Sequence, residues 1–334
     1  MSDVGLLGWI TPKLIAHDQH ARGLIARVLG ASTQNRQAIY AALAHEGLHG
    51  VAPDAGLFQS NFDAACERAM RLRNCPAPEI IRAVYGNVPE GYLGALERCG
   101  NAPLKPESYV RLFEIFRTHD RPKIEALRYV GEITDEVLEV LFTLSPPLVN
   151  PKVLARTDDV FKATALNDAI ACIQQINSQA TDEAITEAVR QLGEKSELKT
   201  MVSRFVKRAD RLPPQPLPAD DELVPLDTVP ALIAASRKYQ NCMRRYIGRV
   251  IHGATAFAEY QERLILEFKP LADGGWLLED VHTLNNARVS PEDRKSARDK
   301  CAAGGVSHVR REFDGPEGWR GVEIMIQGWG WSLD

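Results

Sequence analysis

A proline-rich segment at residues 212–227 limits what this chain can fold into more than any other feature. Five prolines stand in LPPQPLPADDELVPLD, among few large side chains. Proline has no backbone N–H and a fixed φ, so a dense run of it cannot continue a helix or form the interior of a sheet. We therefore predict an extended linker over 212–227. It would separate an N-terminal domain, residues 1–211, from a C-terminal domain, residues 228–334.

The residues before this segment are patterned as a succession of short helices. Segments with helical periodicity end repeatedly at Gly or Pro. The first, residues 11–30, begins with Thr11 as the predicted N-cap and Pro12 at the first helical position. The next follows Ser32 or Thr33 as its cap. No repeat period of the tetratricopeptide or HEAT kind emerges, so we predict an irregular all-α array.

The residues after the segment predict a mixed domain. RLILEFKP, residues 263–270, and WLLEDVH, residues 276–282, alternate side chains as strands do. The Asp-Gly pair between them is a strong hairpin signal. A helix capped by Ser290 and two final strands within residues 307–332 complete the prediction. The predicted fold class is therefore α+β, an all-α N-terminal array joined to a small α+β domain.

A helix predicted from residue 239 onward carries its charge on one face. Residues 228–253 hold five Lys and Arg and no Asp or Glu, so they are +5 in a chain of net charge −4. Such a face can attract nucleic-acid phosphate or an acidic protein surface, although a solvated helix face has the same pattern. The residues predicted to bind a partner are Lys238, Arg244, Arg245, Arg249 and His252. The opposite, apolar face comprises Tyr239, Cys242, Met243, Tyr246, Ile247, Val250 and Ile251.

Four residues along this stretch stand in a characteristic order. A Cys and a Tyr precede a strand that contains Glu, and a polar Asn follows. They are Cys242, Tyr246, Glu279 and Asn286. This order resembles the C-terminal domain of PcfJ-like proteins, a family linked to conjugative plasmids and other mobile elements. The sequence departs from the family pattern at Asn241, where the family has His, and in the large residues that follow Cys242. The resemblance implies a domain type without implying a reaction.

The same stretch holds the candidates for catalysis. Cys242 could act as a nucleophile, with His282 or His252 as its base and Glu279 or Asn286 orienting that base. The alternative is that Cys242 is a small buried side chain on the apolar face, as Cys usually is. Neither a Walker A motif nor GxGxxG is present, so a nucleotide cofactor has no support.

A second motif predicts different chemistry. His45-Glu46-Gly47-Leu48-His49 matches HExxH, in which two His on one helix face bind zinc and the Glu acts as general base. Glu67 lies where related metallopeptidases have a third ligand. However, such enzymes carry a sheet before the motif, and here the preceding residues are patterned as helix. The alternative interpretation is two histidines near a helix C-terminus, where the helix dipole favours them.

Composition sets the remaining bounds. The six Cys are scattered without a CxxC pair, which favours reduced thiols and a cytoplasmic location. The near-neutral charge balance argues against a protein that binds nucleic acid over its whole surface. We therefore expect a non-enzymatic binding or accessory protein without a cofactor or membrane segment. The alternative is a zinc-dependent hydrolase.

Overall fold

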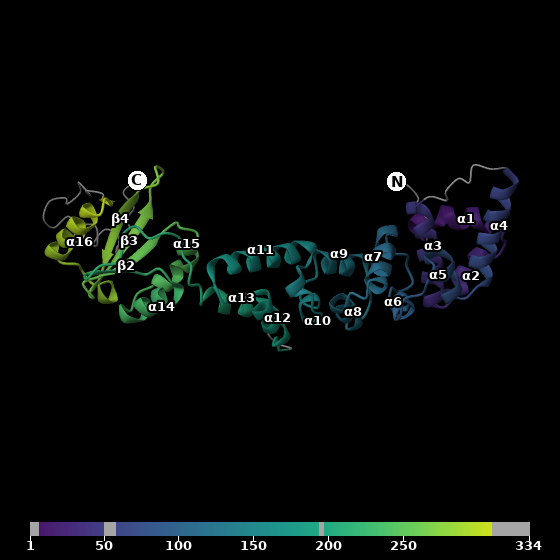
Figure 1. Ribbon diagram of the computed structural model, residues 1–334, viewed down its shortest axis with the longest axis horizontal. Coiled ribbons are helices and arrows are strands. Elements are labelled where there is room, and N and C mark those ends of the chain that lie inside the picture. The colour runs from purple at the N-terminus through teal and green to yellow at the C-terminus, as the bar shows by residue number, and fades with distance from the viewer. Residues whose placement is uncertain (1–6, 50–57, 194–196, 309–334) are drawn as a thin grey trace, which may run out of the picture. The chain divides into compact units, whose positions relative to one another are not determined.

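The computed structural model describes residues 7–49, 58–193 and 197–308, and of residues 49 and 58–62 it describes the backbone alone. Helices and a small sheet in the C-terminal part confirm the predicted α+β class (Figure 1). The chain divides into two compact units. The N-terminal unit is Met1–Cys172 with Ala180–Val202, and the C-terminal unit is Ile173–Gln179 with Ser203–Asp334.

The described residues before Leu223 form helices and turns without a strand. No described helix is long and apolar enough to cross a membrane. In chain order the helices are η1 Gly8–Ile10, α1 Thr11–His20, α2 Leu24–Gly30, α3 Thr33–His49, α4 Phe58–Asn74, α5 Ala77–Tyr85, α6 Tyr92–Glu97, α7 Pro106–Arg117, α8 Arg121–Arg128, α9 Asp135–Thr143, η2 Pro146–Leu148, α10 Pro151–Leu154, α11 Val160–Ile176, α12 Asp182–Arg190 and α13 Leu198–Val206.

Helix α3 is the core of the first part of the N-terminal unit. Its middle turns, residues 38–44, are buried on all sides, and it packs against α5, α6 and α7. The buried Gln37 side chain donates hydrogen bonds to the carbonyls of Gly100 and Ala102, both at 2.8 Å, and accepts one from the Tyr109 hydroxyl. Because a buried amide must be satisfied, Gln37 fixes the loop after α6 against α3.

The helix predicted over residues 11–30 is in fact two helices. Gly23 lies between them with φ 98°, a left-handed conformation that ends the first helix. The Asp18 carboxylate accepts hydrogen bonds from the amides of Gly23 and Ile25, both at 3.0 Å. This contact replaces the helical bonds that the break removes. The predicted cap of α3 is confirmed, because the Ser32 hydroxyl accepts a bond from the Asn35 amide.

The described residues of the C-terminal unit form a five-stranded sheet in the order β1-β2-β3-β4-β5. Strands β1 to β4 pair antiparallel, and β5 pairs parallel to β4. Its elements are β1 Leu223–Pro225, α14 Val229–Lys238, η3 Met243–Tyr246, α15 Ile247–Ile251, β2 Ala256–Tyr260, β3 Leu264–Pro270, β4 Trp276–His282, η4 Leu284–Asn286, α16 Pro291–Ala303 and β5 Ser307–His308.

The predicted linker over residues 212–227 is instead part of this unit. Leu223 pairs with Tyr260, so the end of the segment supplies the edge strand β1. Leu217 and Leu226 are buried as well. The prolines prevent a helix, but the leucines between them bury apolar surface on the sheet. Proline is tolerated in an edge strand such as β1, and the segment is therefore anchored rather than extended in solvent.

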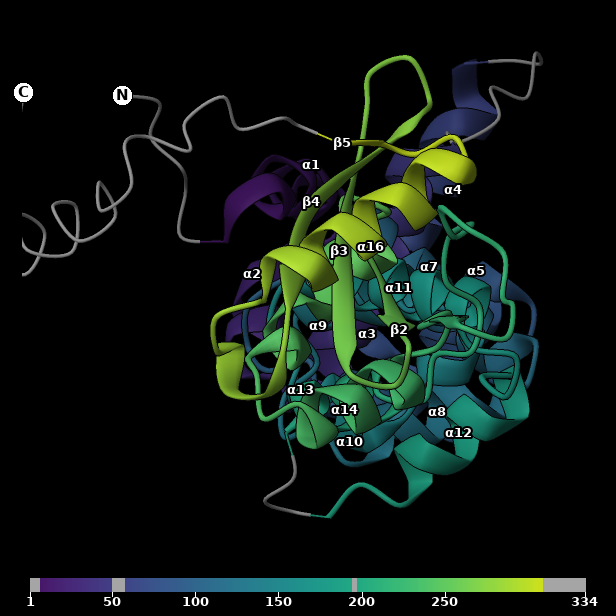
Figure 2. The same cartoon turned by 90° about the vertical axis from the view of Figure 1, so that its left-hand side faces the viewer.

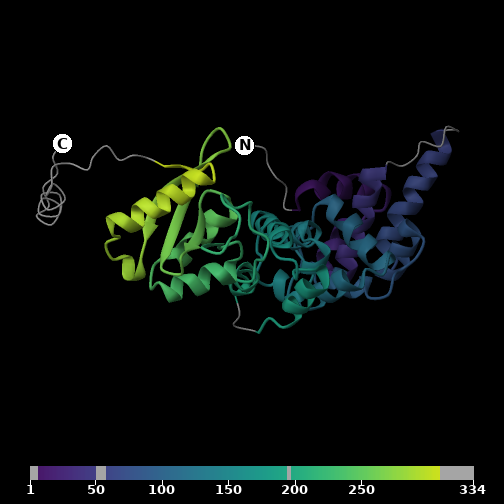
Figure 3. The same cartoon turned by 60° about the vertical axis from the view of Figure 1, so that its left-hand side comes forward.

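Helices cover both faces of the sheet, so the unit has three layers. Helix α16 lies across one face (Figure 2), and Figure 3 shows the strands between α16 and α14. The buried side chains on the α16 face include Leu264, Leu266, Phe268, Leu278, Val281, Ala297 and Cys301. Those on the other face include Leu232, Tyr239, Met243, Val250, Phe257 and Ile265.

The predicted β3–β4 hairpin is confirmed, but the strict alternation predicted for β4 is wrong. Glu267 pairs with Asp280 and the next residue, Phe268, pairs with Leu278, so Glu279 is an unpaired bulge residue. Leu278 and Val281 therefore face the same core, which alternation would place on opposite faces.

The structure describes the remaining C-terminal predictions only as far as residue 308. Helix α16 is confirmed with its cap, because the Ser290 hydroxyl accepts a hydrogen bond of 3.0 Å from the Asp293 amide. The predicted final hairpin reaches into residues 309–334, which lie outside the described residues.

Candidate functional site

The single helix predicted from residue 239 is broken near its start. After α14 ends, Gln240 takes φ 49° and the chain resumes as the short helices η3 and α15. The buried Ser236 hydroxyl donates a hydrogen bond of 2.8 Å to the Asn241 carbonyl. The Asn241 side chain in turn accepts one of 3.2 Å from the Met243 amide. These side-chain contacts compete with continued helix, as Ser and Asn commonly do.

The break changes the position of Cys242. Tyr239, Met243 and Val250 are buried as the apolar pattern predicts, but Cys242 is exposed. A residue in a turn does not follow the helical period that assigned it to the apolar face. Cys242 is therefore available to solvent and to its neighbours.

A second turn meets this one. Asn285 and Asn286 both take left-handed φ, 57° and 53°, a conformation that Asn tolerates better than most residues. The Asn285 amide donates a hydrogen bond of 2.9 Å to the Tyr239 carbonyl. The turn after β4 is thereby fixed to the turn after α14, and this contact brings Asn286 and Cys242 to one pocket.

The pocket has a volume of about 330 Å³ and is lined from both core clusters of the sheet, with Met243 and Phe257 from the face opposite α16 and Val281 and Val289 from the α16 face. The short segment around η3, strands β2 to β4, the turn after β4 and the start of α16 all contribute to it. Its polar lining residues are Asn241, Cys242, Tyr246, Glu267, Asp280, His282, Asn286, Arg288 and Arg294. Its apolar lining residues are Met243, Phe257, Val281, Ala287 and Val289.

A histidine–carboxylate pair forms part of the pocket wall. His282 Nε2 lies 3.0 Å from Glu267 Oε2. The hydrogen bond to Glu267 raises the pKa of His282 above its ordinary value, burial opposes the rise, and the nearby Asp280 adds to it. The protonated imidazole is therefore favoured, with Glu267 as its counter-ion.

Two carboxylates face each other across the strands at this wall. Glu267 and Asp280 are cross-strand neighbours, an arrangement that costs stability when both are charged. Asp280 Oδ1 accepts a hydrogen bond of 2.8 Å from the Val281 amide and lies 3.7 Å from Arg294. Within the described part of the chain, Glu267 Oε1 and Asp280 Oδ2 have no hydrogen-bond partner. The pocket therefore offers two acceptors to a ligand.

The structure brings together three of the four candidate catalytic residues. Cys242, His282 and Asn286 line the same pocket. Glu279 does not join them, because its carboxylate pairs with Lys269 at 2.8 Å, and Glu267 bonds His282 in its stead. The bulge causes this exchange. It removes Glu279 from the strand pairing, so that Glu267 faces Asp280 instead. A bulge leaves no signal in strand alternation, so the sequence could not distinguish the two glutamates.

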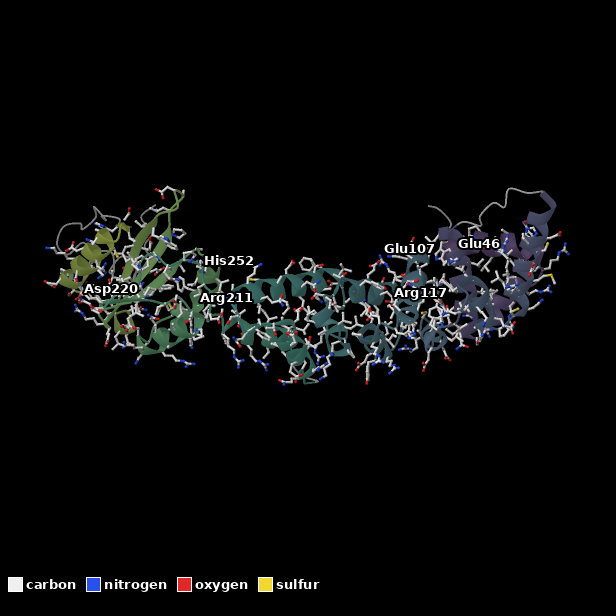
Figure 4. All side chains as sticks on the ribbon, viewed as in Figure 1. Glu46, Glu107, Arg117, Arg211, Asp220 and His252 are labelled. Carbon is white, nitrogen blue, oxygen red and sulfur yellow. The ribbon has the colours of Figure 1, made fainter. Side chains whose placement is uncertain are left out.

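Not all residues of the predicted basic surface can bind a partner through their charge. Lys238 and the Tyr239 hydroxyl both bond to Glu259, so the charge of Lys238 is neutralised. Arg244, Arg245 and Arg249 are exposed, and no acidic partner of theirs occurs among residues 7–49, 58–193 and 197–308. The Arg249 guanidinium lies over the Tyr246 ring, 5.4 Å from its centroid. His252 is exposed directly after α15 (Figure 4).

The HExxH motif ends α3, and the side chain of His49 lies outside the described residues. His45, Glu46 and Glu67 line a pocket of about 370 Å³ in the N-terminal unit, where Figure 4 labels Glu46. Glu46 Oε2 is held at 2.9 Å by His17 Nε2, which keeps the pKa of Glu46 below its ordinary value. Glu67 pairs with Arg71 at 2.9 Å.

The contacts of these glutamates differ from those that the zinc motif requires. A general base needs a carboxylate free to take a proton from metal-bound water, and Glu46 is engaged by His17. Among the side chains that the structure describes, no three His, Cys, Asp or Glu are grouped to hold a metal ion. The side chain of His49 is not among those described.

Comparison of the chain with protein-family models, with curated proteins and with solved structures found no match. The similarity to PcfJ-like proteins therefore rests on the motif residues alone. The function must be argued from the pocket of the C-terminal unit and the arginines beside it.

Proposed function

We propose that this is a binding protein whose C-terminal unit engages nucleic acid through Arg244, Arg245 and Arg249. The observation that carries the proposal is that Arg244, Arg245 and Arg249 are exposed within one six-residue segment and have no ion-pair partner among the described residues. In the same unit, Arg263 and Lys269 each form an ion pair below 3 Å with an acidic side chain. The three arginines have no such partner in the described chain. Cations left without counter-ions on one short segment form a local positive field.

Phosphate fits these arginines well. A guanidinium presents its donors in a planar fork that matches phosphate oxygens, and it stays charged at every physiological pH. Arg244 and Arg245 are adjacent in η3, and Arg249 follows in α15, so the three belong to one local structure. They can contact successive phosphates of a strand.

An acidic protein surface is the rival partner, and the pocket disfavours it. Within the described residues, Glu267 and Asp280 each leave one carboxylate oxygen unbonded beside η3. They repel carboxylates and phosphates alike, but a nucleic acid also presents nucleobases, whose amino groups carboxylates accept. Nucleic acid is therefore the better complement to the site.

The test is a salt titration with the full-length protein and labelled single- and double-stranded DNA and RNA. Each arginine replaced by Gln should reduce the magnitude of the slope of log K against log salt by about 0.7–0.9. Reversal of Arg244, Arg245 and Arg249 together to Glu should abolish binding with the melting temperature retained, since these side chains are exposed.

A matched control changes the net charge equally at another place. Arg82, Arg121 and Arg128 are exposed and have no ion-pair partner in the described residues of the N-terminal unit. Reversing these three to Glu should leave binding within about twofold of wild type, because it changes the net charge equally without removing a proposed phosphate contact. Wild-type protein that binds no oligonucleotide at about 50 mM salt, or binds polyglutamate instead, refutes the proposal.

Two further expectations about function remain. An association with mobile elements rests on the similarity of Cys242, Tyr246, Glu279 and Asn286 to the PcfJ-like pattern. Zinc-dependent hydrolysis is the alternative function, favoured by the shared pocket of His45, Glu46 and Glu67 and weakened by the contact between Glu46 and His17. Metal analysis of the purified protein decides between nucleic-acid binding and zinc-dependent hydrolysis.

A further inference from the structure

We infer that the pocket lined by Glu267, Asp280 and His282 takes a nucleobase with an exocyclic amino group from a single strand, whose phosphates contact Arg244 and Arg245. This inference rests on the proposed function and deepens it, because it names the form of nucleic acid and the part that is read. The arginines would supply affinity and the pocket would supply the preference for a base.

The first step is that the arginines and the pocket share one short segment. Arg244 and Arg245 lie within η3, while Cys242, Met243 and Tyr246 on either side of them line the pocket. A phosphate on η3 is therefore only a side chain's length from the pocket. In a strand, a base is attached to each phosphate through one sugar, so the two sites can engage one nucleotide.

The second step is the chemistry of the wall. Glu267 Oε1 and Asp280 Oδ2 are acceptors without a partner in the described part of the chain. Glu267 is held in position through its other oxygen by His282. Carboxylates read bases by accepting from exocyclic amino groups, as Asp and Glu do with cytosine N4. Thymine and uracil have no such group and present a single N–H donor, at N3, so they can satisfy only one of these two acceptors, whereas an amino group has a donor for each.

The third step is the shape and character of the rest of the pocket. Tyr246 and Phe257 line it and form an edge-to-face pair, with ring centroids 5.9 Å apart. Aromatic walls are what unstacked bases contact in single-strand binding proteins. Asn286 adds an amide with both donor and acceptor. The volume of about 330 Å³ is sufficient for a small ligand.

The fourth step excludes a duplex as the main ligand. In a paired helix the amino groups of the Watson–Crick edge are already hydrogen-bonded and the bases are stacked. A base reaches such a pocket only from a single strand or after it is flipped out of the duplex, which costs unstacking and unpairing. Single strands with amino-bearing bases should therefore bind best.

The experiment measures fluorescence anisotropy of the full-length protein with oligo(dC), oligo(dA), oligo(dT) and a mixed-sequence duplex at one salt concentration. Wild type should bind oligo(dC) and oligo(dA) about tenfold more tightly than oligo(dT). Asp280→Asn combined with Glu267→Gln should remove that preference and leave the salt slope unchanged. Glu279→Gln is the matched control, because Glu279 pairs with Lys269 and does not line this pocket.

The outcomes separate the two proposals. Equal affinity for oligo(dC), oligo(dA) and oligo(dT), or tighter binding of the duplex, overturns the base pocket and leaves the arginine surface intact. A control variant that loses the preference as fully as the pocket variant also overturns it. Absence of binding to every oligonucleotide overturns the proposed function itself. The homopolymer comparison uses wild type alone, so it stands even if the double variant does not fold.

Discussion

Two histidine–glutamate pairs line two pockets of this molecule, one in each unit. His17 and Glu46 are 2.9 Å apart in the N-terminal unit, and His282 and Glu267 are 3.0 Å apart in the C-terminal unit. The geometry of the pairs is nearly the same, and their surroundings differ. The first lies between packed helices, and the second lies on a sheet face beside a further carboxylate, Asp280.

The difference teaches that the neighbours of such a pair decide what it does. The hydrogen bond with His17 lowers the pKa of Glu46 most, and the charges that add to this, from His17, Arg68 and Lys13, are all positive. Such a carboxylate is stabilised as an ion within the fold. Glu267 instead faces Asp280, and in the described part of the chain the two carboxylates leave two acceptor oxygens unbonded. The first carboxylate is satisfied by its neighbours, whereas the second pair leaves acceptors that the proposed ligand would fill.

The largest expected effect separates the pairs by stability. His17 is 8% exposed, and His17→Ala should destabilise the N-terminal unit by about 2–3 kcal/mol, because it leaves Glu46 without its partner and opens a cavity. His282 is less buried, with 26% of its side chain exposed against 9% for His17. His282→Ala should therefore cost the C-terminal unit about 1 kcal/mol.

Hydrogen exchange of the full chain measures both effects locally, in peptides from residues 33–47 and 264–282. His252→Ala, at an exposed position, is the control and should change neither. Equal losses from His17→Ala and His282→Ala, each in its own unit, would remove the distinction between a structural pair and one that awaits a ligand.

The sequence predicted the elements that depend on local patterns. Ser290 caps α16 as its spacing indicates, and the alternation of residues 264–270 identifies β3. Each of these depends on residues close together in the chain. The α+β class follows from them, because helical and alternating patterns are segregated along the sequence.

The parts that could not be predicted depend on contacts between distant residues. Leu217 and Leu226 are buried on a sheet that forms from later residues, so proline density alone suggested a linker. The bulge at Glu279 made Glu267 the partner of His282. The turn after α14, which the Ser236 hydroxyl bonds at Asn241, exposed Cys242. Of the site, Cys242, His282 and Asn286 were predicted to be neighbours, whereas Glu267, Asp280 and Arg294 were missed.

A smaller effect should distinguish the pairs by pH. The pKa of Glu46 is lowered from 4.5, so its pair contributes stability above that value and loses it as pH falls through the lower folded value. The pKa of His282 is raised from 6.5. Its pair contributes fully below 6.5 and loses its contribution as pH rises through the higher folded value. The two units should therefore weaken at opposite ends of the pH range.

The measurement compares wild type with Glu46→Gln and His282→Gln across pH 3–9 by the same hydrogen-exchange peptides, corrected for intrinsic exchange rates. The difference for Glu46→Gln should shrink on acidification, and that for His282→Gln should shrink above neutral pH. A His282→Gln difference that grows as pH rises would contradict the raised pKa.

The smallest expected effect concerns zinc. A chelator should have no effect on the protein. If the first pair is structural, purified protein should contain far less than one zinc per chain, and a chelator should leave its melting temperature unchanged. Binding of a metal to the folded state alone would stabilise it, so removal of that metal would lower the melting temperature. Wild type and the double variant His45→Ala/His49→Ala should respond identically.

The result has consequences for both pockets. Glu46 cannot serve as general base while His17 holds it, so zinc catalysis would need this contact to open and free the carboxylate. If wild type contains stoichiometric zinc, and the double variant loses both the zinc and the sensitivity to chelator, the N-terminal pair belongs to a metal centre. The hydrolase alternative would then outrank nucleic-acid binding. Zinc that persists in the double variant would place the metal elsewhere and leave the comparison of the two pairs unchanged.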